Sequence, residues 1–374
     1  MKLFRKNGIA PIAAVGALAL TLAACGSDDP TETGTDTTPA GEATSTEDAS
    51  SLSGELSGAG ASSQESAMQA WIAGFQSANP DVTVAYDPVG SGGGRKQFLE
   101  GGTQFGGTDS ALKDDELALA AEVCAPGEFL EVPLYISPIA VAFNLPGIDT
   151  LNMSAETIAK IFDGRITRWD DPAIAEANPG VDLPDLAITP VNRSDESGTS
   201  ENFTEYLAAA AGDAWPHEPS GDWPISGTQS AQGTSGVVQV VTDAEGAITY
   251  ADASKVGGLG TVAVGVGDEF VPYSPEAAAA VVDASPLAEG RPETSLVREL
   301  ERDTTESGVY PIVLVSYTIA CTDYDDDAQG ELVKEFLTYV ASEEGQQAAS
   351  QAAGSAPISE EMRSDVMAIV ETIS

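Results

Sequence analysis

A charged and hydroxyl-rich stretch at residues 193–200 is the part of this sequence that most directly indicates chemistry. It follows a strand-like run at 187–191 and precedes a helix-like run at 201–211. A strand that turns into a helix through Ser, Gly and Thr presents free backbone N–H groups, and such groups bind anions. Arg193 adds a cationic fork that Asp195 could hold in place. The stretch therefore predicts anion binding, and the alternative is an ordinary helix cap beside a surface ion pair.

Two other turns have the same order of strand, glycine turn and helix. Residues 82–86 are strand-like, 90–94 are rich in glycine, and a short helix is expected at about 95–99. A third turn at 105–110 leads into a helix expected near 114–123. The glycines at 90–94 allow close backbone approach or positive φ. They have neither the Gly-Lys-Ser/Thr of a P-loop nor the spacing of a dinucleotide-binding fingerprint.

Composition argues against several classes of function. The chain has 374 residues, with 16 Lys and Arg against 59 Asp and Glu and a formal charge of −43. Nucleic acid is not an expected partner, because binding to a phosphate backbone relies on clustered basic residues. His217 is the one histidine, so the chain has few of the side chains from which a zinc site or a Ser-His-Asp triad is built. With no G-x-S-x-G elbow either, we expect no enzyme activity, metal or cofactor.

The N-terminus is typical of a bacterial secretion signal. Basic residues within the first six positions precede an apolar run at 9–24, which is shorter than the ~20 residues that span a membrane. Residues 22–26 read Leu-Ala-Ala-Cys-Gly and resemble a lipobox. We expect residues 1–24 to be the signal peptide and Cys25 to carry a lipid that anchors the chain to the extracytoplasmic face of the cell membrane. The alternative is a soluble secreted protein with an incidental cysteine.

Export also bears on the residues that follow the signal. Residues 25–53 are expected to form a flexible acidic tether rich in Thr and Ser, because they offer too little apolar area to order themselves.

Cys124 and Cys321 remain once Cys25 is accounted for. Outside the cytoplasm two such cysteines are most simply a disulfide, with two separate buried thiols as the alternative.

Alternating strand and helix signals after residue 54 predict an α/β fold. Two long apolar runs, at 133–145 and 310–320, are expected to be buried strands. Ser62 with Glu65 three residues later matches a capping box, so a helix is expected to begin there.

Four motifs in order along the chain resemble one known family. They are the Gly-Ala-Gly-Ala-Ser opening at 58–62, the glycine turn at 90–94, Phe-Gly-Gly-Thr-Asp at 105–109 and the Arg-x-Asp-x-Ser-Gly-Thr pattern at 193–199. Together they resemble the phosphate-binding protein of the phosphate ABC transporter. The segments at 161–164 and 169–172 are also similar to that family, and the resemblance extends from about residue 52 to the C-terminus.

The resemblance implies an architecture and partners. It implies a two-lobed, type II periplasmic-binding-protein-like fold with a two-strand hinge near Val141 and Val315. Lobe 1 is then expected to combine 54–141 with 315–374, and lobe 2 to cover 142–314. It further implies a monomer that captures inorganic phosphate between the lobes and delivers it to the membrane permease subunits of an ABC importer.

The resemblance also implies a set of phosphate contacts, with Asp195 orienting Arg193. By position these contacts are Ser62, Ser63, Ser91, Asp109, Arg193, Ser197, Gly198 and Thr199. Many members of the family have Thr-Phe where this chain has Ser62 and Ser63, so Ser63 is expected to contribute only its backbone N–H.

Asp109 bears on specificity within this interpretation. A carboxylate repels an anion unless the anion carries a proton for it to accept, and phosphate carries one at neutral pH whereas sulfate does not. Asp109 therefore favours phosphate over another tetrahedral oxyanion such as sulfate or molybdate, but it does not exclude arsenate. A helix cap is the alternative for Asp109. A secreted phosphatase and a surface lipoprotein with a decayed site are the remaining alternatives for the chain.

Overall fold

The sheet is organised around one long strand, β4 (Phe129–Phe143), whose 15 residues are all buried. The computed structural model describes residues 52–374, so the expected signal peptide, Cys25 and nearly all of the expected tether lie outside the described residues. The first part of β4 pairs antiparallel with β11 (Val313–Cys321), and its last five residues pair antiparallel with β8 (Ala247–Asp252). One strand therefore takes part in both halves of the sheet.

The first half of the sheet has the strand order β2-β1-β3-β11-β4. Strand β1 (Gly54–Gly60) runs parallel to β2 (Val82–Asp87) and to β3 (Phe105–Thr108), and β11 is antiparallel to β3. Phe75 on the first helix packs edge-on against Phe336, which also contacts Phe105 of β3. The helices of this half are α1 (Glu65–Ala78), α2 (Ser91–Leu99), α3 (Asp114–Val123), α9 (Asp327–Ala341), α10 (Glu343–Ala353) and α11 (Glu360–Val370).

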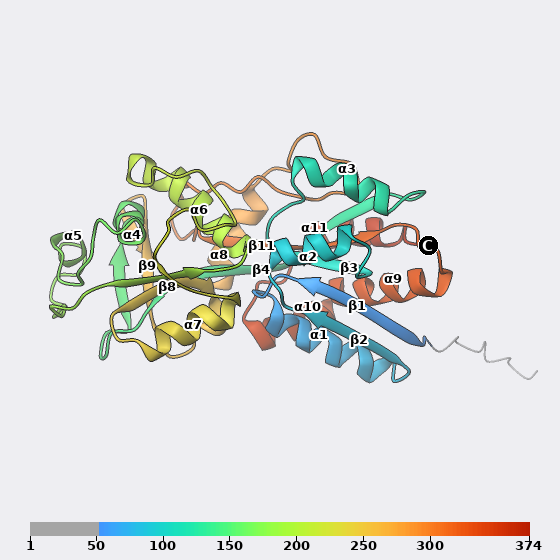
Figure 1. Cartoon of the computed structure of the whole chain (residues 1–374), viewed down its shortest axis with the longest axis horizontal. Coiled ribbons are helices and arrows are strands. Elements are labelled where there is room, and N and C mark those ends of the chain that lie inside the picture. The colour runs from blue at the N-terminus through green and yellow to red at the C-terminus, as the bar shows by residue number, and fades with distance from the viewer. Residues whose placement is uncertain (1–51) are drawn as a thin grey trace, which may run out of the picture. The chain divides into compact units, whose positions relative to one another are not determined.

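The second half continues from β4 through β8 to β6 (Thr189–Arg193) and β7 (Gln229–Ala231). Strand β9 (Gly260–Val266) pairs with the end of β4 and with two short strands, β5 (Thr150–Met153) and β10 (Glu269–Val271). The helices here are α4 (Ala155–Phe162), α5 (Pro172–Ala175), α6 (Gly198–Ala211), α7 (Gly233–Asp243) and α8 (Pro275–Ala284), with short 3₁₀ turns η1 (Gly212–Ala214) and η2 (Ala253–Lys255). Figure 1 shows β4 and β11 between these two groups of elements.

The predicted α/β class is confirmed, and so are the two buried strands. The runs expected at 133–145 and 310–320 lie largely within β4 and β11, which begin at Phe129 and Val313 and end at Phe143 and Cys321; both strands are buried along their whole length. Strand β4 joins the two halves, because it pairs with β11 in one and with β8 in the other, whereas β11 pairs with β3 and β4. The two-strand hinge near Val141 and Val315 stays a prediction. The residue boundaries of the two lobes remain a prediction.

The capping box predicted at Ser62 is wrong. Helix α1 begins at Glu65 with Gln64 as its N-cap, and no side chain caps it. The Ser62 hydroxyl instead interacts with Thr234, which lies 172 residues further along the chain. A tertiary partner has replaced the local one that the spacing favoured.

Helix α2 also begins earlier than predicted, at Ser91 instead of near residue 95. Gly90 precedes it with φ of +97°, a conformation that glycine adopts without strain. A Cβ on Gly94 would lie 2.4 Å from the Cα of Gly60, so glycine is required for α2 to pack against β1. Close packing thus explains a helix made of residues with weak helix propensity.

The structure contains a disulfide between Cys124 and Cys321. It joins the end of α3 to the end of β11, with the two Cα atoms 5.1 Å apart and a sequence separation of 197. Within residues 52–374, none of the helices combines the length and the apolar character needed to cross a membrane.

Candidate anion-binding site

The predicted contact residues come from turns in which a strand ends and a helix or loop begins. Ser62 and Ser63 follow β1, Ser91 opens α2, Asp109 follows β3, and Ser197 to Thr199 open α6 after β6. Because β1, β2 and β3 are parallel, their carboxyl ends meet at the same edge of the sheet. The topology therefore gathers several helix N-termini, which carry partial positive charge, at one place.

Asp109 is the residue on which these turns converge. The Ser63 hydroxyl donates to both of its carboxylate oxygens, at 2.7 and 2.8 Å, and Thr199 Oγ1 donates to Oδ2 at 3.0 Å. The Asp109 backbone N–H donates to Ser91 Oγ at 3.0 Å. The Ser63 hydroxyl, for which no role was expected, thus bonds Asp109, while the phosphate contact expected of its backbone N–H remains a prediction. Asp109 is only 3% exposed, so these bonds are formed almost out of contact with solvent.

Burial raises the pKa of Asp109 above its ordinary value, while hydrogen bonds from Ser63 and Thr199 and the charge of Arg193 act in the opposite direction. The hydroxyls favour the ionised form, because a donor stabilises a carboxylate more than a neutral acid. The result is a buried acceptor with several donors around it. Such a group can accept a hydrogen bond from a protonated oxyanion.

Arg193 is held by Asp195, as the two-residue spacing predicts. Arg193 Nε donates to Asp195 Oδ1 at 2.9 Å, and Nη2 donates to Oδ2. Gly233 N, in the first turn of α7, also donates to Asp195 at 3.1 Å. Burial opposes the ionisation of Asp195, but the hydrogen bond and charge of Arg193 outweigh it and lower the pKa of Asp195. The guanidinium is therefore fixed and charged while 97% of its residue surface is covered.

The first turn of α6 fits tightly against the Asp109 turn. Ser197 is the N-cap of α6, and its hydroxyl accepts from Ser200 N at 3.2 Å. A Cβ on Gly198 would lie 2.6 Å from both Asp109 Cβ and Ser91 Oγ, so only glycine permits this approach. Asn202 on the same helix donates to the backbone carbonyl of Asp109 at 2.7 Å. The two parts of the site are thus in direct contact.

Ser62 connects the site to a helix that the sequence did not predict as part of it. Thr234 N donates to Ser62 Oγ at 3.0 Å, and the two hydroxyls are 3.1 Å apart. Thr234 is in the first turn of α7 and is buried. A sequence signal for this turn exists, because residues 233–236 read Gly-Thr-Ser-Gly after a short strand and resemble the Ser-Gly-Thr-Ser turn that begins at Ser197.

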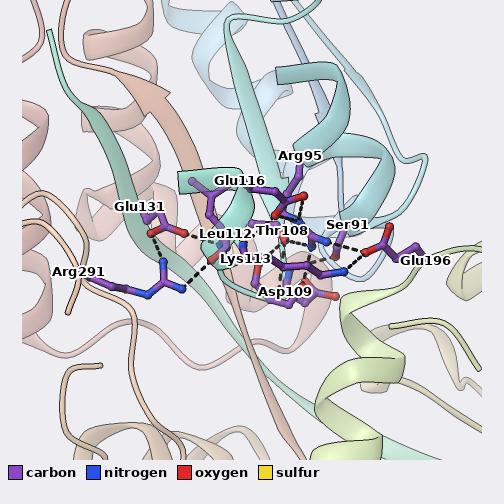
Figure 2. Close-up of polar contacts among 11 residues, drawn as sticks. Ser91, Arg95, Thr108, Asp109, Leu112, Lys113, Glu116, Glu131, Glu196 and Arg291 are labelled. Carbon is purple, nitrogen blue, oxygen red and sulfur yellow. Dashed lines mark hydrogen bonds and ion pairs between the residues drawn. The ribbon is translucent and has the colours of Figure 1, made fainter. Parts of the chain in front are cut away.

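An ion network centred on the buried Arg95, beside Asp109, is a second feature that sequence reasoning missed. Figure 2 shows Arg95 between Glu116 and Glu196, with Lys113 also directed at Glu196. Arg95 Nη1 donates to the hydroxyls of Thr108 and Ser110, the two neighbours of Asp109, at 3.2 and 2.7 Å. Arg95 therefore holds the Asp109 turn from one side.

The same turn is held on its other side by Glu131 and Arg291. Glu131 accepts from Leu112 N at 2.8 Å and from Arg291 Nη1 at 2.6 Å, and Arg291 also donates to the carbonyl of Leu112 (Figure 2). Glu131 is fully buried on β4, so this contact fixes the turn to the central strand.

A cavity of about 660 Å³ lies next to the site and reaches Asp109. Its lining includes Asn202 from α6 and Arg298 and Arg302 from the segment before β11. Across residues 52–374, no cluster of three or more His, Cys, Asp or Glu side chains is arranged to hold a metal ion. The site therefore offers hydroxyls, backbone N–H groups, one guanidinium and one carboxylate acceptor.

Comparison with known proteins gives a consistent picture. A protein-family profile described as "PBP superfamily domain" matches residues 37–344. The chain is 32% identical to the phosphate-binding protein PstS2 of Mycobacterium bovis (strain BCG / Pasteur 1173P2) over 382 aligned residues, which cover 100% of both chains. It is 33% identical to the phosphate-binding protein PstS 3 of Mycobacterium tuberculosis (strain ATCC 25618 / H37Rv), with 90% of each covered.

A solved structure has the same fold. It is a high-affinity periplasmic phosphate-binding protein, PfluDING, bound with phosphate, and it matches with a TM-score of 0.69 and 23% identity over 84% of this chain and 93% of that chain. The sequence relatives share far more than half of their length with this chain. The chain belongs to the PBP superfamily and, within it, to the phosphate-binding protein PstS family.

Proposed function

We propose that this protein captures inorganic phosphate outside the cytoplasm and delivers it to an ABC importer. The observation that carries the proposal is that Arg193, held by Asp195, lies close enough for its charge to act on the buried Asp109, which also accepts from Thr199 at the start of α6. Arg193 supplies one compensating charge, and the helix N-termini and hydroxyls supply neutral donors. The names of the relatives, all phosphate-binding proteins, support the same ligand.

Selectivity for phosphate follows from Asp109. At neutral pH phosphate carries a proton that Asp109 can accept, whereas sulfate would set an unprotonated oxygen against a carboxylate. Leaving a buried acceptor facing another acceptor is strongly unfavourable, so sulfate is rejected. Arsenate carries a proton as phosphate does, and we propose that it also binds.

We propose a binding role without catalysis. Asp109 is the carboxylate that faces the ligand, and it is placed to accept a hydrogen bond while Ser63 and Thr199 occupy it as donors. His217, the one histidine of the chain, hydrogen-bonds with Asp163 at 2.8 Å just after α4, so its Nε2 is engaged locally. We further propose a monomer with one phosphate clamped between lobe 1 (54–141 plus 315–374) and lobe 2 (142–314).

Cys25 is proposed to carry the lipid that keeps the protein at the membrane, on the evidence of the lipobox-like residues 22–26. A Cys25→Ser variant expressed in a bacterial host is expected in the culture medium or in an unprocessed form. Recovery of processed variant in the membrane fraction, as for the unaltered chain, would contradict the anchor.

Isothermal titration of the protein with phosphate, arsenate and sulfate tests the ligand assignment. We expect one phosphate per chain, comparable binding of arsenate and much weaker binding of sulfate. Equal binding of phosphate and sulfate would exclude the role given to Asp109. Binding of neither anion would exclude oxyanion capture altogether.

A further inference from the structure

Glu196 lies inside the Arg193–Thr199 turn, but its carboxylate is bound by cations that belong to other segments. It accepts from Arg95 Nη2 at 2.8 Å and from Lys113 Nζ at 2.5 Å (Figure 2). Arg95 is on α2 and Lys113 precedes α3, so both cations belong to the turns after β2 and β3. Glu196 is therefore an ionic link between two sets of proposed phosphate contacts that lie far apart in the sequence.

Arg95 connects Glu196 to the turn that contains Asp109. It is 1% exposed, and Nε is satisfied by Glu116 at 2.9 Å while Nη1 bonds the hydroxyls of Thr108 and Ser110. The partner of Nη2 comes from the second half of the sheet, in the form of Glu196. If the two halves separated, Arg95 Nη2 would lose Glu196 as its acceptor. Leaving a buried, charged donor without a partner costs free energy.

The backbone around Glu196 is fitted to α2 as closely as its side chain. Gly92 N donates to the Glu196 carbonyl at 3.2 Å, and a Cβ on Gly92 would lie 2.3 Å from Glu196 Oε2. Burial opposes the ionisation of Glu196, but hydrogen bonds and charges from Lys113 and Arg95 outweigh it and lower its pKa. Burial also opposes the charged form of Lys113, but the pairing with Glu196 outweighs it and raises the pKa of Lys113, so both partners favour the ion pair.

We propose that Glu196 is a positioning residue for phosphate binding, whose ion pairs with Arg95 and Lys113 hold the Arg193–Thr199 turn against α2 and thereby slow the release of phosphate. This inference rests on the proposed function. Glu196 is not one of the proposed phosphate contacts, because its carboxylate is already engaged by two cations. The pairs must break when the two halves separate and are remade when they close, so they act on the closed, phosphate-bound form.

The proposal predicts a change in dissociation more than in association. Contacts formed only after the partners have met alter mainly the rate of dissociation. Glu196→Gln keeps the size of the side chain but removes the charge. Since a hydrogen bond to a charged group contributes more than a neutral one, we expect release of phosphate to become roughly tenfold faster and association to change by less than about threefold.

Release of radiolabelled phosphate into an excess of unlabelled phosphate measures this rate, with binding to the unaltered chain measured first. The matched control is Glu100→Gln, which removes one negative charge from the C-terminal end of α2, the helix that carries Arg95; Glu100 is 65% exposed and 4.0 Å from Lys96. We expect the control to release phosphate at the unaltered rate. Equal release rates for Glu196→Gln and Glu100→Gln, with tight binding by the unaltered chain, would overturn the inference and leave the proposed function standing.

Lys113→Gln provides a second variant, and because Lys113 is 45% exposed the substitution does not disturb the core. It is expected to speed release when Glu196 is present and to have no further effect on Glu196→Gln. Independent, additive effects of the two substitutions would contradict a shared ion pair. Failure of the unaltered chain to bind phosphate would instead overturn the proposed function, and this inference with it.

Discussion

At the scale of single residues, the proposed site includes a carboxylate, Asp109, although a carboxylate ordinarily repels an anion. Asp109 is buried, which raises its pKa, and the Ser63 and Thr199 hydroxyls counter that effect by donating to the ionised form. A neutral Asp109 would itself carry a proton that it could donate, so it would no longer favour a protonated ligand. The hydroxyls therefore support both the charge and the orientation of the group that we propose distinguishes phosphate from sulfate.

Asp109→Asn is expected to weaken phosphate binding by about tenfold or more and to reduce the preference for phosphate over sulfate, because an amide can also donate a hydrogen bond to an unprotonated oxygen. Isothermal titration with both anions measures the ratio. Asp268→Asn, an exposed position after β9, is the control and should behave as the unaltered chain. An unchanged selectivity ratio in Asp109→Asn would mean that Asp109 only caps its turn.

Ser63→Ala removes the donor that bonds both oxygens of Asp109. Since that bond lowers the pKa of Asp109, its loss lets the pKa rise further, and the ionised form disappears at a higher pH. Phosphate affinity should therefore begin to fall at a higher pH than in the unaltered chain as the solution is acidified. Ser63→Thr retains the hydroxyl and should restore the original profile, whereas identical profiles for all three proteins would contradict this role.

Much of the site could be predicted from residues that are adjacent in sequence. The spacing of Arg193 and Asp195 gave an ion pair that the structure contains. Arg95 and Thr234 were missed, because their partners lie 101 and 172 residues away and no local pattern marks such contacts. The capping box at Ser62 failed for the same physical reason, since a distant hydroxyl and N–H compete with the helix for the same oxygen.

At the scale of elements, strand β4 joins the two halves of the sheet and brings a second buried carboxylate with it. Tyr135 on β4 donates to both oxygens of Asp252 at the end of β8, at 3.2 and 3.1 Å. Asp252 also accepts from Ser254 N at 2.9 Å. Burial raises the pKa of Asp252 to about 6, and the charge of Asp109 contributes in the same direction.

This pKa predicts a loss of stability as pH rises. The unfolded chain releases the Asp252 proton near its ordinary pKa, but the folded chain retains it to about pH 6. Above that pH the folded state carries a buried charge, which costs about 3 kcal/mol of unfolding free energy. The free energy of unfolding of the unaltered chain should therefore decrease by that amount between about pH 4 and 7, and in Asp252→Asn this decrease should be absent. Urea unfolding at several pH values measures both. Identical pH dependence for the variant and the unaltered chain would contradict the assignment.

Long apolar strands were predictable from the sequence, but helix starts were not. Strands β4 and β11 come from long, mainly apolar runs, which signal burial on both faces. Helix α2 contains Gly92, Gly93 and Gly94, and propensity alone argues against a helix there. Its stability comes from packing against β1 and the turn at Glu196, contacts that depend on the completed fold.

At the scale of the whole molecule, the charge opposes the proposed ligand. Removing the expected signal peptide would take the formal charge from −43 to −46, so phosphate meets a repulsive long-range field. Binding must therefore rely on short-range donors in the buried site. These include the fixed guanidinium of Arg193 and the first turns of α2, α6 and α7, whose dipoles act over about one turn.

Titration with phosphate in increasing sodium chloride, from about 0.02 to 0.5 M, tests this enclosed site most directly, because these concentrations span Debye lengths well above and below ~10 Å. The salt screens distant carboxylates but acts little on N–H groups and hydroxyls buried around Asp109. We predict saturable binding of one phosphate per chain, with an affinity that is nearly constant across the series and association that is unchanged or slightly faster. A steep loss of affinity with salt, or no saturable binding, would contradict capture of phosphate in a buried site.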